Sequence, residues 1–218
     1  MLRLVPATPK PAPSNPNDFS QKHADFIRQL NTPGFFCDFK EISHKLFSFY
    51  AQDASHGLVN SFSLKIQDNS NPTLASGEPS TPVLVCDFPT TDGSQLSKIV
   101  LGDEYLEAIL MFQFHLKVLE ALFLFGMDKG TESLILTVDR DYTDWIHAYS
   151  DFIVSKGQVM TKKGMQTQLT ISTDMQTYDA LIELMEIMDD GFRQSLWREQ
   201  RDNPAIRLYL KSHALAEL

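Results

Sequence analysis

The feature that most constrains the fold is the most apolar run in the chain, from Ala108 to Phe125. A membrane-spanning helix needs about 20 predominantly apolar residues with few charges. Four polar side chains interrupt this run: Gln113, His115, Lys117 and Glu120. We therefore predict a helix buried in a protein core. Asp103 can cap its N-terminus, and Lys129-Gly130 can end it near Asp128.

Shorter apolar segments on both sides of this helix predict β-strands. The continuous β-branched and leucine run from Ser133 to Val138 is typical of a strand covered on both faces. Between Leu58 and Gln67, apolar residues alternate with polar ones, as on a half-buried strand. The other predicted strands are Leu2 to Val5, Val83 to Phe88, Leu96 to Leu101, and a hairpin from Gln158 to Ser172 that folds at Lys163-Gly164.

Several further segments have helical spacing. Between Phe39 and Ala51, apolar residues recur at intervals of three and four and form one stripe. This stripe consists of Ile42, Leu46, Phe49 and Tyr50. We also predict helices from Phe19 to Leu30 and from Asp141 or Thr143 to about Ser155-Lys156-Gly157. The mixture of strands and helices in one chain predicts an α/β fold with a mixed sheet.

The chain is predicted to be helical again from Asp174 to its end. Asp189-Asp190-Gly191 is expected to break this helical run, and Pro204 to start a last helix. We therefore divide the chain into a domain at 1–173 and a C-terminal helical extension at 174–218. The apolar faces of the extension must pack on something. They either cover the sheet of their own chain or form a two-fold contact in a homodimer.

Charge and cysteine content exclude several classes of function. The formal net charge is −9, from 28 acidic and 19 basic residues, whereas a nucleic-acid-binding protein normally carries a basic footprint. The two cysteines, Cys37 and Cys86, form no disulfide framework and indicate a reducing compartment. The N-terminus lacks the pattern of a secretory signal. We expect a cytoplasmic protein that binds neither nucleic acid nor a membrane.

Few chemical motifs are present. We find no GxSxG, Walker loop, HExxH or dinucleotide fingerprint, so hydrolase, nucleotide-binding and oxidoreductase functions lack support. No histidine pair has the spacing of metal ligands, and we predict no metal site. His115, within the apolar run, is expected to be a core histidine, and His44 and His56 lie outside that run.

Four segments, taken in order, resemble the GNAT family of acyl-CoA-dependent N-acetyltransferases. The first, Leu2-Arg3-Leu4-Val5-Pro6-Ala7-Thr8, is similar to the LRxRPAT start common in that family. Gly102-Asp103-Glu104-Tyr105 is similar to the DPEY before its acyl-CoA loop. Leu134 to Asp139 resembles its LxLxVD strand, and the following VDxxNxxAxxLYxKxGF pattern matches at Val138, Asp139 and Tyr149. The resemblance covers roughly residues 1–173.

The resemblance implies where an acyl-CoA, such as acetyl-CoA, would bind. In that family, two parallel strands diverge and the cofactor enters the gap. Here they would be the strand ending near Leu101 and the strand starting near Ser133. Main-chain groups at the gap can hydrogen-bond the pantetheine arm, and a helix N-terminus can hold the diphosphate. The implied cofactor-binding residues are Ile99, Val100, Leu101, Leu106, Ala108, Ile109 and Tyr142.

The expected diphosphate loop departs from the family pattern. The family uses Q/R-x-x-G-x-G/A, in which glycines let the backbone approach the phosphates. This chain has Leu106-Glu107-Ala108-Ile109-Leu110-Met111, without a glycine or a cation. Glu107 adds a negative charge, and Ile109 and Met111 are bulky. Two hypotheses therefore stand: an acyltransferase acting on a small-molecule or peptide amine, or a catalytically inactive module of the same fold that binds a ligand or a protein.

Three residues are the candidate catalytic groups of the acyltransferase hypothesis. Tyr149 matches the family tyrosine that protonates the departing thiolate, which is general acid catalysis. Its alternative is an amphipathic helix tyrosine with no catalytic role. Asp87 or Glu104 would be the base that deprotonates the amine. The alternatives are a polar strand end for Asp87 and a first-turn acid beside the helix dipole for Glu104.

Overall fold

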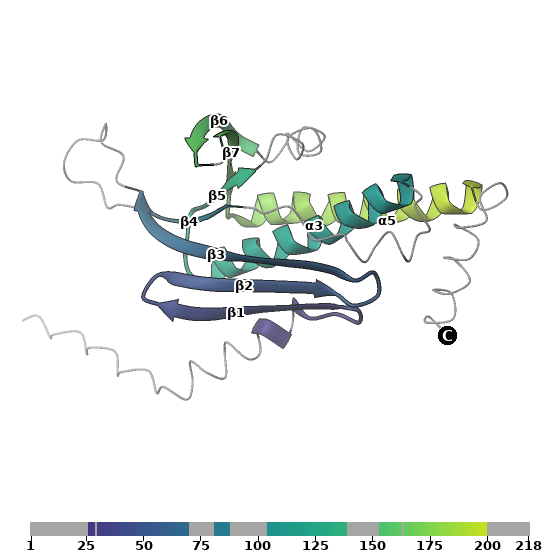
Figure 1. Cartoon of the computed structure of the whole chain (residues 1–218), viewed down its shortest axis with the longest axis horizontal. Helices are drawn as coiled ribbons and strands as arrows, with labels where there is room; N and C mark the ends of the chain where they lie inside the picture. Colours follow the sequence, from purple (N-terminus) through teal and green to yellow (C-terminus); the bar gives the residue numbers. More distant parts are fainter. Residues whose placement is uncertain are drawn as a thin grey trace, which may run out of the picture.

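The structure is a computed structural model that describes residues 26–28, 30–69, 81–87, 104–138, 153–162 and 164–199. Within these residues, a seven-stranded sheet packs against two long helices (Figure 1). In chain order, the elements are β1 (Phe35–Ser43), β2 (Leu46–Asp53), β3 (Leu58–Asn69), β4 (Thr81–Asp87), α3 (Glu104–Asp128), β5 (Ser133–Val138), β6 (Ile153–Thr161), β7 (Gly164–Ser172) and α5 (Met175–Glu199). The predicted α/β class with a mixed sheet is confirmed.

The strands lie in the order β1-β2-β3-β4-β5-β7-β6. β4 and β5 are parallel, and the other neighbouring pairs among the described strands are antiparallel. The register places like residues in rows across the sheet. One row joins Phe47, Leu64, Cys86, Leu136 and Leu169, all of them buried. One face of the sheet is therefore a continuous apolar surface.

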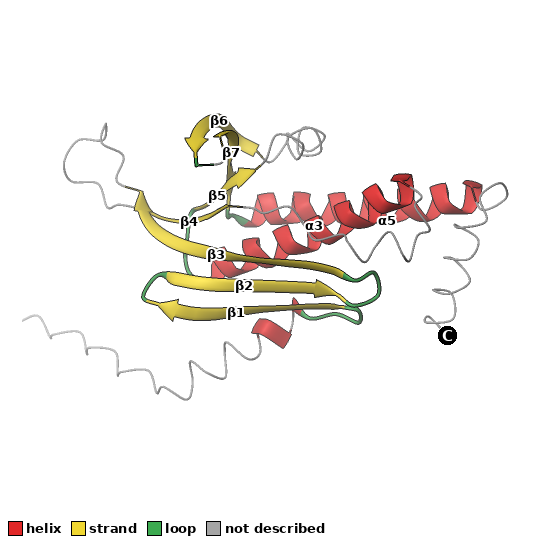
Figure 2. Ribbon diagram, in the orientation of Figure 1, coloured by secondary structure: helices red, strands yellow, loops and turns green. Residues whose placement is uncertain are grey.

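Both long helices lie on this apolar face (Figure 2). From α3, Phe114 meets Phe35 edge to face, and Phe125 stacks on Phe39 with ring centroids 4.2 Å apart. α5 runs antiparallel to α3, because its start contacts Phe123 through Tyr178 while Asp189, further along, approaches Gln113. The extension predicted at 174–218 thus contains a helix packed on its own chain.

The predicted apolar helix is α3. Glu107–Asp128 is long and apolar enough to span a membrane by length and composition alone, but half of that stretch is buried inside the protein. At its C-terminus, Gly130 adopts a φ of 66°, which glycine tolerates best. The Thr131 N–H bonds the Gly126 carbonyl at 2.9 Å and satisfies one of the last helical acceptors. The stop predicted at Lys129-Gly130 is confirmed.

The helix predicted from Phe39 to Ala51 is wrong, because this segment forms the β1–β2 hairpin. Burial alternates along β1 at Phe35, Cys37 and Phe39, and again along β2. Ile42, assigned to the apolar stripe of that helix, is 57% exposed. Apolar residues of the two strands also fall three and four apart, at Ile42, Leu46, Phe49 and Tyr50, so a strand pattern and a helical pattern overlap here. Lys45, at a φ of 62°, makes the turn without a glycine.

The predicted partner of the 133–138 strand is also wrong. β5 pairs in parallel with β4, from Val83↔Ser133 to Asp87↔Thr137, and in antiparallel with β7 on its other edge. Both edges of β5 are therefore occupied through Thr137. The strand expected at 96–101 lies outside the described residues.

Two other boundaries need correction. Ile153–Thr161 is strand β6, so the helix predicted to end near Ser155-Lys156-Gly157 cannot extend past residue 152. α5 also continues through Asp189-Asp190-Gly191 to Glu199. One glycine costs a helix about 1 kcal/mol, which neighbouring turns can offset.

The other predicted elements within the described residues are confirmed. They are the strands at 58–67 and 133–138, the strand predicted at 83–88 as far as Asp87, and the hairpin that turns at Gly164, whose φ is 108°. Residues 26–28 and 30 are helical, within the predicted helix from Phe19 to Leu30. The strand at Leu2–Val5, the start of the helix predicted from Asp141 or Thr143, and the last helix from Pro204 lie outside the described residues.

Candidate functional site

The candidate site lies beyond the carboxyl ends of β4 and β5. These strands and α3 form a β-α-β unit in which both strands point the same way. In open α/β sheets, ligands bind outside the carboxyl ends of such strands. β3 continues past this point, because its first pair with β4 is Leu64↔Cys86 and its residues 58–63 lie beyond. The N-terminal half of α3 lies over that extension, as shown by the Phe35–Phe114 contact.

Asp87 is the predicted site residue best placed in this region. It is the last residue of β4, its side chain is exposed, and its backbone lies beside Thr137 of β5. Glu104 opens α3, and Leu106 follows in the first turn. Ile99, Val100, Leu101, Tyr142 and Tyr149 lie outside the described residues, so their assignments stay predictions.

The start of α3 does not fit a diphosphate. Residues 104–111 contain no glycine and no basic side chain, and Glu107 is half-buried there. At ~4 Å, a like charge costs about 1 kcal/mol in water and about 4 kcal/mol at an effective dielectric near 20. Ala108 is half-buried, and Ile109 and Met111 pack against the core. A CoA diphosphate would need other groups to hold it.

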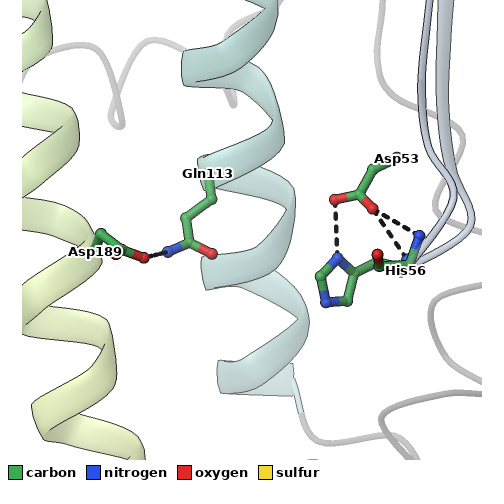
Figure 3. Close-up of polar contacts among 5 residues, drawn as sticks. Asp53, His56, Gln113 and Asp189 are labelled. Atoms are coloured by element: carbon green, nitrogen blue, oxygen red, sulfur yellow. Dashed lines mark hydrogen bonds and ion pairs between the residues drawn. The ribbon is translucent and has the colours of Figure 1, made fainter. Parts of the chain in front are cut away.

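A buried acid–histidine pair occupies the turn between β2 and β3 (Figure 3). His56 Nδ1 lies 2.9 Å from Asp53 Oδ2, and these side chains are 13% and 10% exposed. Asp53 Oδ1 accepts the N–H groups of Ser55 and His56 at 2.9 and 3.2 Å. One carboxylate therefore fixes both the turn and the imidazole.

Lys117 of α3 adds a positive charge beside this pair. Its Nζ lies 5.7 Å from the centroid of Phe35, whose backbone pairs with Asp53. Burial alone would raise the pKa of Asp53. The hydrogen bond and charge of His56, together with the charge of Lys117, outweigh burial and lower the pKa below its usual value. Asp53 is therefore a carboxylate at neutral pH.

A second carboxyl group lies between α3 and α5 with the opposite tendency. The Tyr178 hydroxyl donates to Glu120 Oε1 at 3.3 Å. Burial raises the pKa of Glu120, and the Tyr178 hydrogen bond and Lys117 only partly offset this. The charge of Lys117 thus acts on two carboxyl groups, Asp53 with a lowered pKa and Glu120 with a raised pKa. A longer contact, 3.5 Å from Gln113 Nε2 to Asp189 Oδ1, joins the same two helices (Figure 3).

Burial keeps three further titratable core residues, His115, Cys37 and Cys86, in their neutral forms. Burial lowers the pKa of His115 to about 3, so it is neutral at physiological pH, as expected of a core histidine. Burial, with the charges of Asp38 and Glu120, raises the pKa of Cys37 to about 12. Burial also raises the pKa of Cys86. In the part of the chain that the structure describes, no three His, Cys, Asp or Glu residues are grouped to hold a metal.

The sequence did not indicate the Asp53–His56 pair as a unit. Asp53 lay next to a segment predicted to be helical, where an acid three residues before a histidine is unremarkable. The available signal was the Asp-x-x-His spacing immediately before Gly57, which has a φ of 70° and begins the turn into β3. An aspartate that starts a turn commonly accepts N–H groups two and three residues on.

Comparisons with known proteins find similarity among solved structures but not among sequences. The chain matches no protein-family model and no curated protein sequence. Among solved structures, it is similar to a CoA-dependent acyl-homoserine lactone synthase, BjaI, determined with SAM and isopentyl-CoA. The TM-score is 0.39 and the identity 13%, over 66% of each chain. The chain thus spans just under two thirds of that synthase, and likeness at this level carries no conclusion about chemistry.

Proposed function

We propose that this protein is an acyltransferase that moves an acyl group from coenzyme A to an amine. The supporting observation is the β4–α3–β5 unit, which places one parallel strand pair within an otherwise antiparallel described sheet. Its carboxyl ends are the usual ligand position in such sheets. The order of the GNAT-like sequence motifs supports acyl-CoA as the acyl donor.

The proposed chemistry needs one base and one acid. The amine nitrogen attacks the thioester carbonyl, the new C–N bond forms, and the C–S bond breaks. A base takes the proton from nitrogen, and an acid returns a proton to the leaving thiolate. Asp87 is our choice for the base because it lies exposed at the carboxyl end of β4. Glu104 is the other candidate base, and Tyr149 is the proposed acid.

Calorimetry with acetyl-CoA tests donor binding. We expect saturable heat in the wild-type protein. Glu107→Arg replaces the negative charge at the start of α3 with a positive one, so it should tighten acetyl-CoA binding by about tenfold. Acetyl-pantetheine, which lacks the diphosphate, should bind both proteins equally. No heat at millimolar acetyl-CoA in either protein would rule out the acyltransferase.

Steady-state acyl transfer then separates the catalytic roles. Asp87→Asn should lower kcat by at least about a hundredfold if Asp87 is the base, and Tyr149→Phe should do so if Tyr149 is the acid. Glu132→Gln is the matched control, since Glu132 is exposed at the opposite end of β5. Turnover unchanged in Asp87→Asn but lost in Glu104→Gln would move the base to the helix.

The second candidate is an inactive module of the same fold that binds a ligand or a protein. The observation favouring it is the start of α3, where glycine and cation are missing from 104–111 and Ile109 and Met111 pack on the core. This candidate predicts no acyl transfer to any amine and no response to Glu107→Arg. The calorimetric experiment therefore separates the two functions.

A further inference from the structure

The register of the sheet places the Asp87 side chain on the face opposite α3 and α5. Cys86, Leu136 and Leu169 are cross-strand partners in the buried row that packs against these helices. Successive residues of a strand point to opposite faces of the sheet. Asp87 follows Cys86, so its carboxylate lies on the second face, together with its cross-strand partner Thr137. An acceptor that uses Asp87 as its base therefore approaches from this second face.

A row of polar residues crosses the second face at the carboxyl ends of β4 and β5. Thr137 pairs with Gln168 of β7, and Gln168 pairs with Gly157 of β6. Cross-strand partners share a face, so the row consists of an acid, a hydroxyl, an amide and a residue without a side chain. A Cβ added at Gly157 would meet no atom within 4 Å, so this end of the row has open space beside it. Because neighbouring strands lie about 4.8 Å apart, the backbones at Asp87 and Gln168 are roughly 10 Å apart.

Burial along this row combines access at Asp87 with shielding from water at its neighbours. On the second face of β4, Val83 is 3% exposed, Val85 is half-buried and Asp87 is exposed, so exposure increases toward the carboxyl end. Thr137 is 6% exposed, and Gln168 is half-buried. In such surroundings a hydrogen bond to a ligand is stronger than in water, and a polar group left unpaired is costly. Thr137 and Gln168 are therefore suited to select a ligand by its polar groups.

We propose that Thr137 and Gln168 bind the amine acceptor and select a peptide amine over a simple alkylamine. The proposal rests on the acyltransferase function and names its acceptor class. The amine nitrogen lies at Asp87, and a peptide group further along the acceptor lies at Gln168. The Gln168 amide offers both a carbonyl oxygen and N–H donors, which match the N–H and C=O of a peptide group. An alkylamine makes neither contact and leaves both side chains unpaired.

Acceptor specificity tests the proposal. Acetylation of glycylglycinamide and of n-hexylamine is measured at saturating acetyl-CoA. Gln168→Leu and Thr137→Val should each lower kcat/KM for glycylglycinamide by about tenfold and leave n-hexylamine unchanged, because each removes a hydrogen bond that only the peptide amine makes. Thr137→Ser keeps the hydroxyl and should restore the preference. Thr170→Val is the matched control, since Thr170 lies on the same face of β7 but pairs with Ile135, further from the strand ends.

Binding without the acyl donor separates the acceptor site from the chemistry. Saturation-transfer NMR with glycylglycinamide alone should detect binding to the wild-type protein and to Thr170→Val, and a signal at least about fivefold weaker with Gln168→Leu. Binding that depends on Gln168, without acetylation of any amine, would support the acceptor site and rule out the acyltransferase. Acetylation of glycylglycinamide that is indifferent to both Gln168→Leu and Thr137→Val would overturn the acceptor site and leave the acyltransferase standing. Absence of both binding and acetylation would overturn both.

Discussion

The two halves of the sheet bury different kinds of side chain. On the core face of β1, β2 and β3, the largest residues are phenylalanines: Phe35, Phe39, Phe47, Phe49 and Phe62. On β4, β5 and β7, the residues of that face are mostly aliphatic: Leu84, Leu134, Leu136, Leu169 and Ile171. We call these the aromatic half and the aliphatic half. The helix α3 packs against both halves.

The buried polar residues divide along the same line. The aromatic half contains Asp53 and Asn60, whereas the buried polar residues in and beside the aliphatic half, where burial is described, are threonines. Threonine hydroxyls can bond a nearby carbonyl, as Thr131 does to Gly126 at 3.0 Å. A buried carboxylate needs charged or multiple donors, and Asp53 has His56, two backbone N–H groups and Lys117 nearby. Among the described residues, the aromatic half therefore buries a carboxylate with its polar partners, whereas the aliphatic half buries neutral threonine hydroxyls.

Truncating a core residue in each half should give the largest effects. Phe49 is fully buried between the rings of Phe39 and Phe62. Phe49→Ala should lower the free energy of unfolding by about 4 kcal/mol, and Leu134→Ala by about 3 kcal/mol. Urea denaturation followed by circular dichroism measures both values. A larger loss for Leu134→Ala would contradict the view that ring packing dominates.

Removing the Asp53 carboxylate should cost about 2–3 kcal/mol, because Asp53→Ala leaves three partly buried donors without this acceptor. Asp53→Asn keeps one acceptor oxygen and should cost less. The lowered pKa of Asp53 means that its contribution is present above about pH 4 and is lost as pH falls through its folded-state value. Denaturation at several pH values should therefore show wild type and Asp53→Ala converging in acid. A difference that does not vary with pH would refute the charge argument.

Glycine substitutions at the two ends of the aliphatic half should have smaller effects. Gly130→Ala places a side chain at a φ of 66° and should cost about 1 kcal/mol. Gly157→Ala, in β6, meets no atom within 4 Å and should be neutral or slightly stabilising. Thermal unfolding compares the pair. Because an added Cβ meets no atom within 4 Å at either position, equal losses would show that the positive φ of Gly130 is not the cause.

The smallest expected effect is at Glu120. Its raised pKa means that the folded state disfavours the charge, so its contribution to stability declines as pH rises through the unfolded-state value. Glu120→Gln preserves an acceptor for Tyr178 and should change stability by less than about 1 kcal/mol at pH 7, in the stabilising direction. Asp53→Asn is the contrasting variant. Destabilisation by Glu120→Gln that matched Asp53→Asn would show that the carboxylate itself is needed.

The aliphatic half was largely predictable from the sequence, and the aromatic half was not. Ser133 to Val138 is an unbroken β-branched and leucine run, and Gly130 and Gly164 mark their turns. In the aromatic half, Ile42, Leu46, Phe49 and Tyr50 satisfy a helical spacing although they lie on two strands, and Lys45 gives no turn signal. The neighbour of β5 in the sheet could not be predicted either, because the local sequence pattern does not show whether β5 pairs with β4 or with residues 96–101. Of the candidate site, the sequence located Asp87 at a strand end, but the Asp53–His56 pair depends on a turn that only the correct strand assignment reveals.

The sharing of α3 between the halves has a consequence for folding. This 25-residue helix packs against the aromatic half at Phe114 and lies close to Thr131 and Thr173, beside the aliphatic half, at Gly126. Neither half retains a covered core once this helix leaves. Opening either half far enough to release α3 exposes the other, so the most slowly exchanging amides of both halves should share one opening free energy.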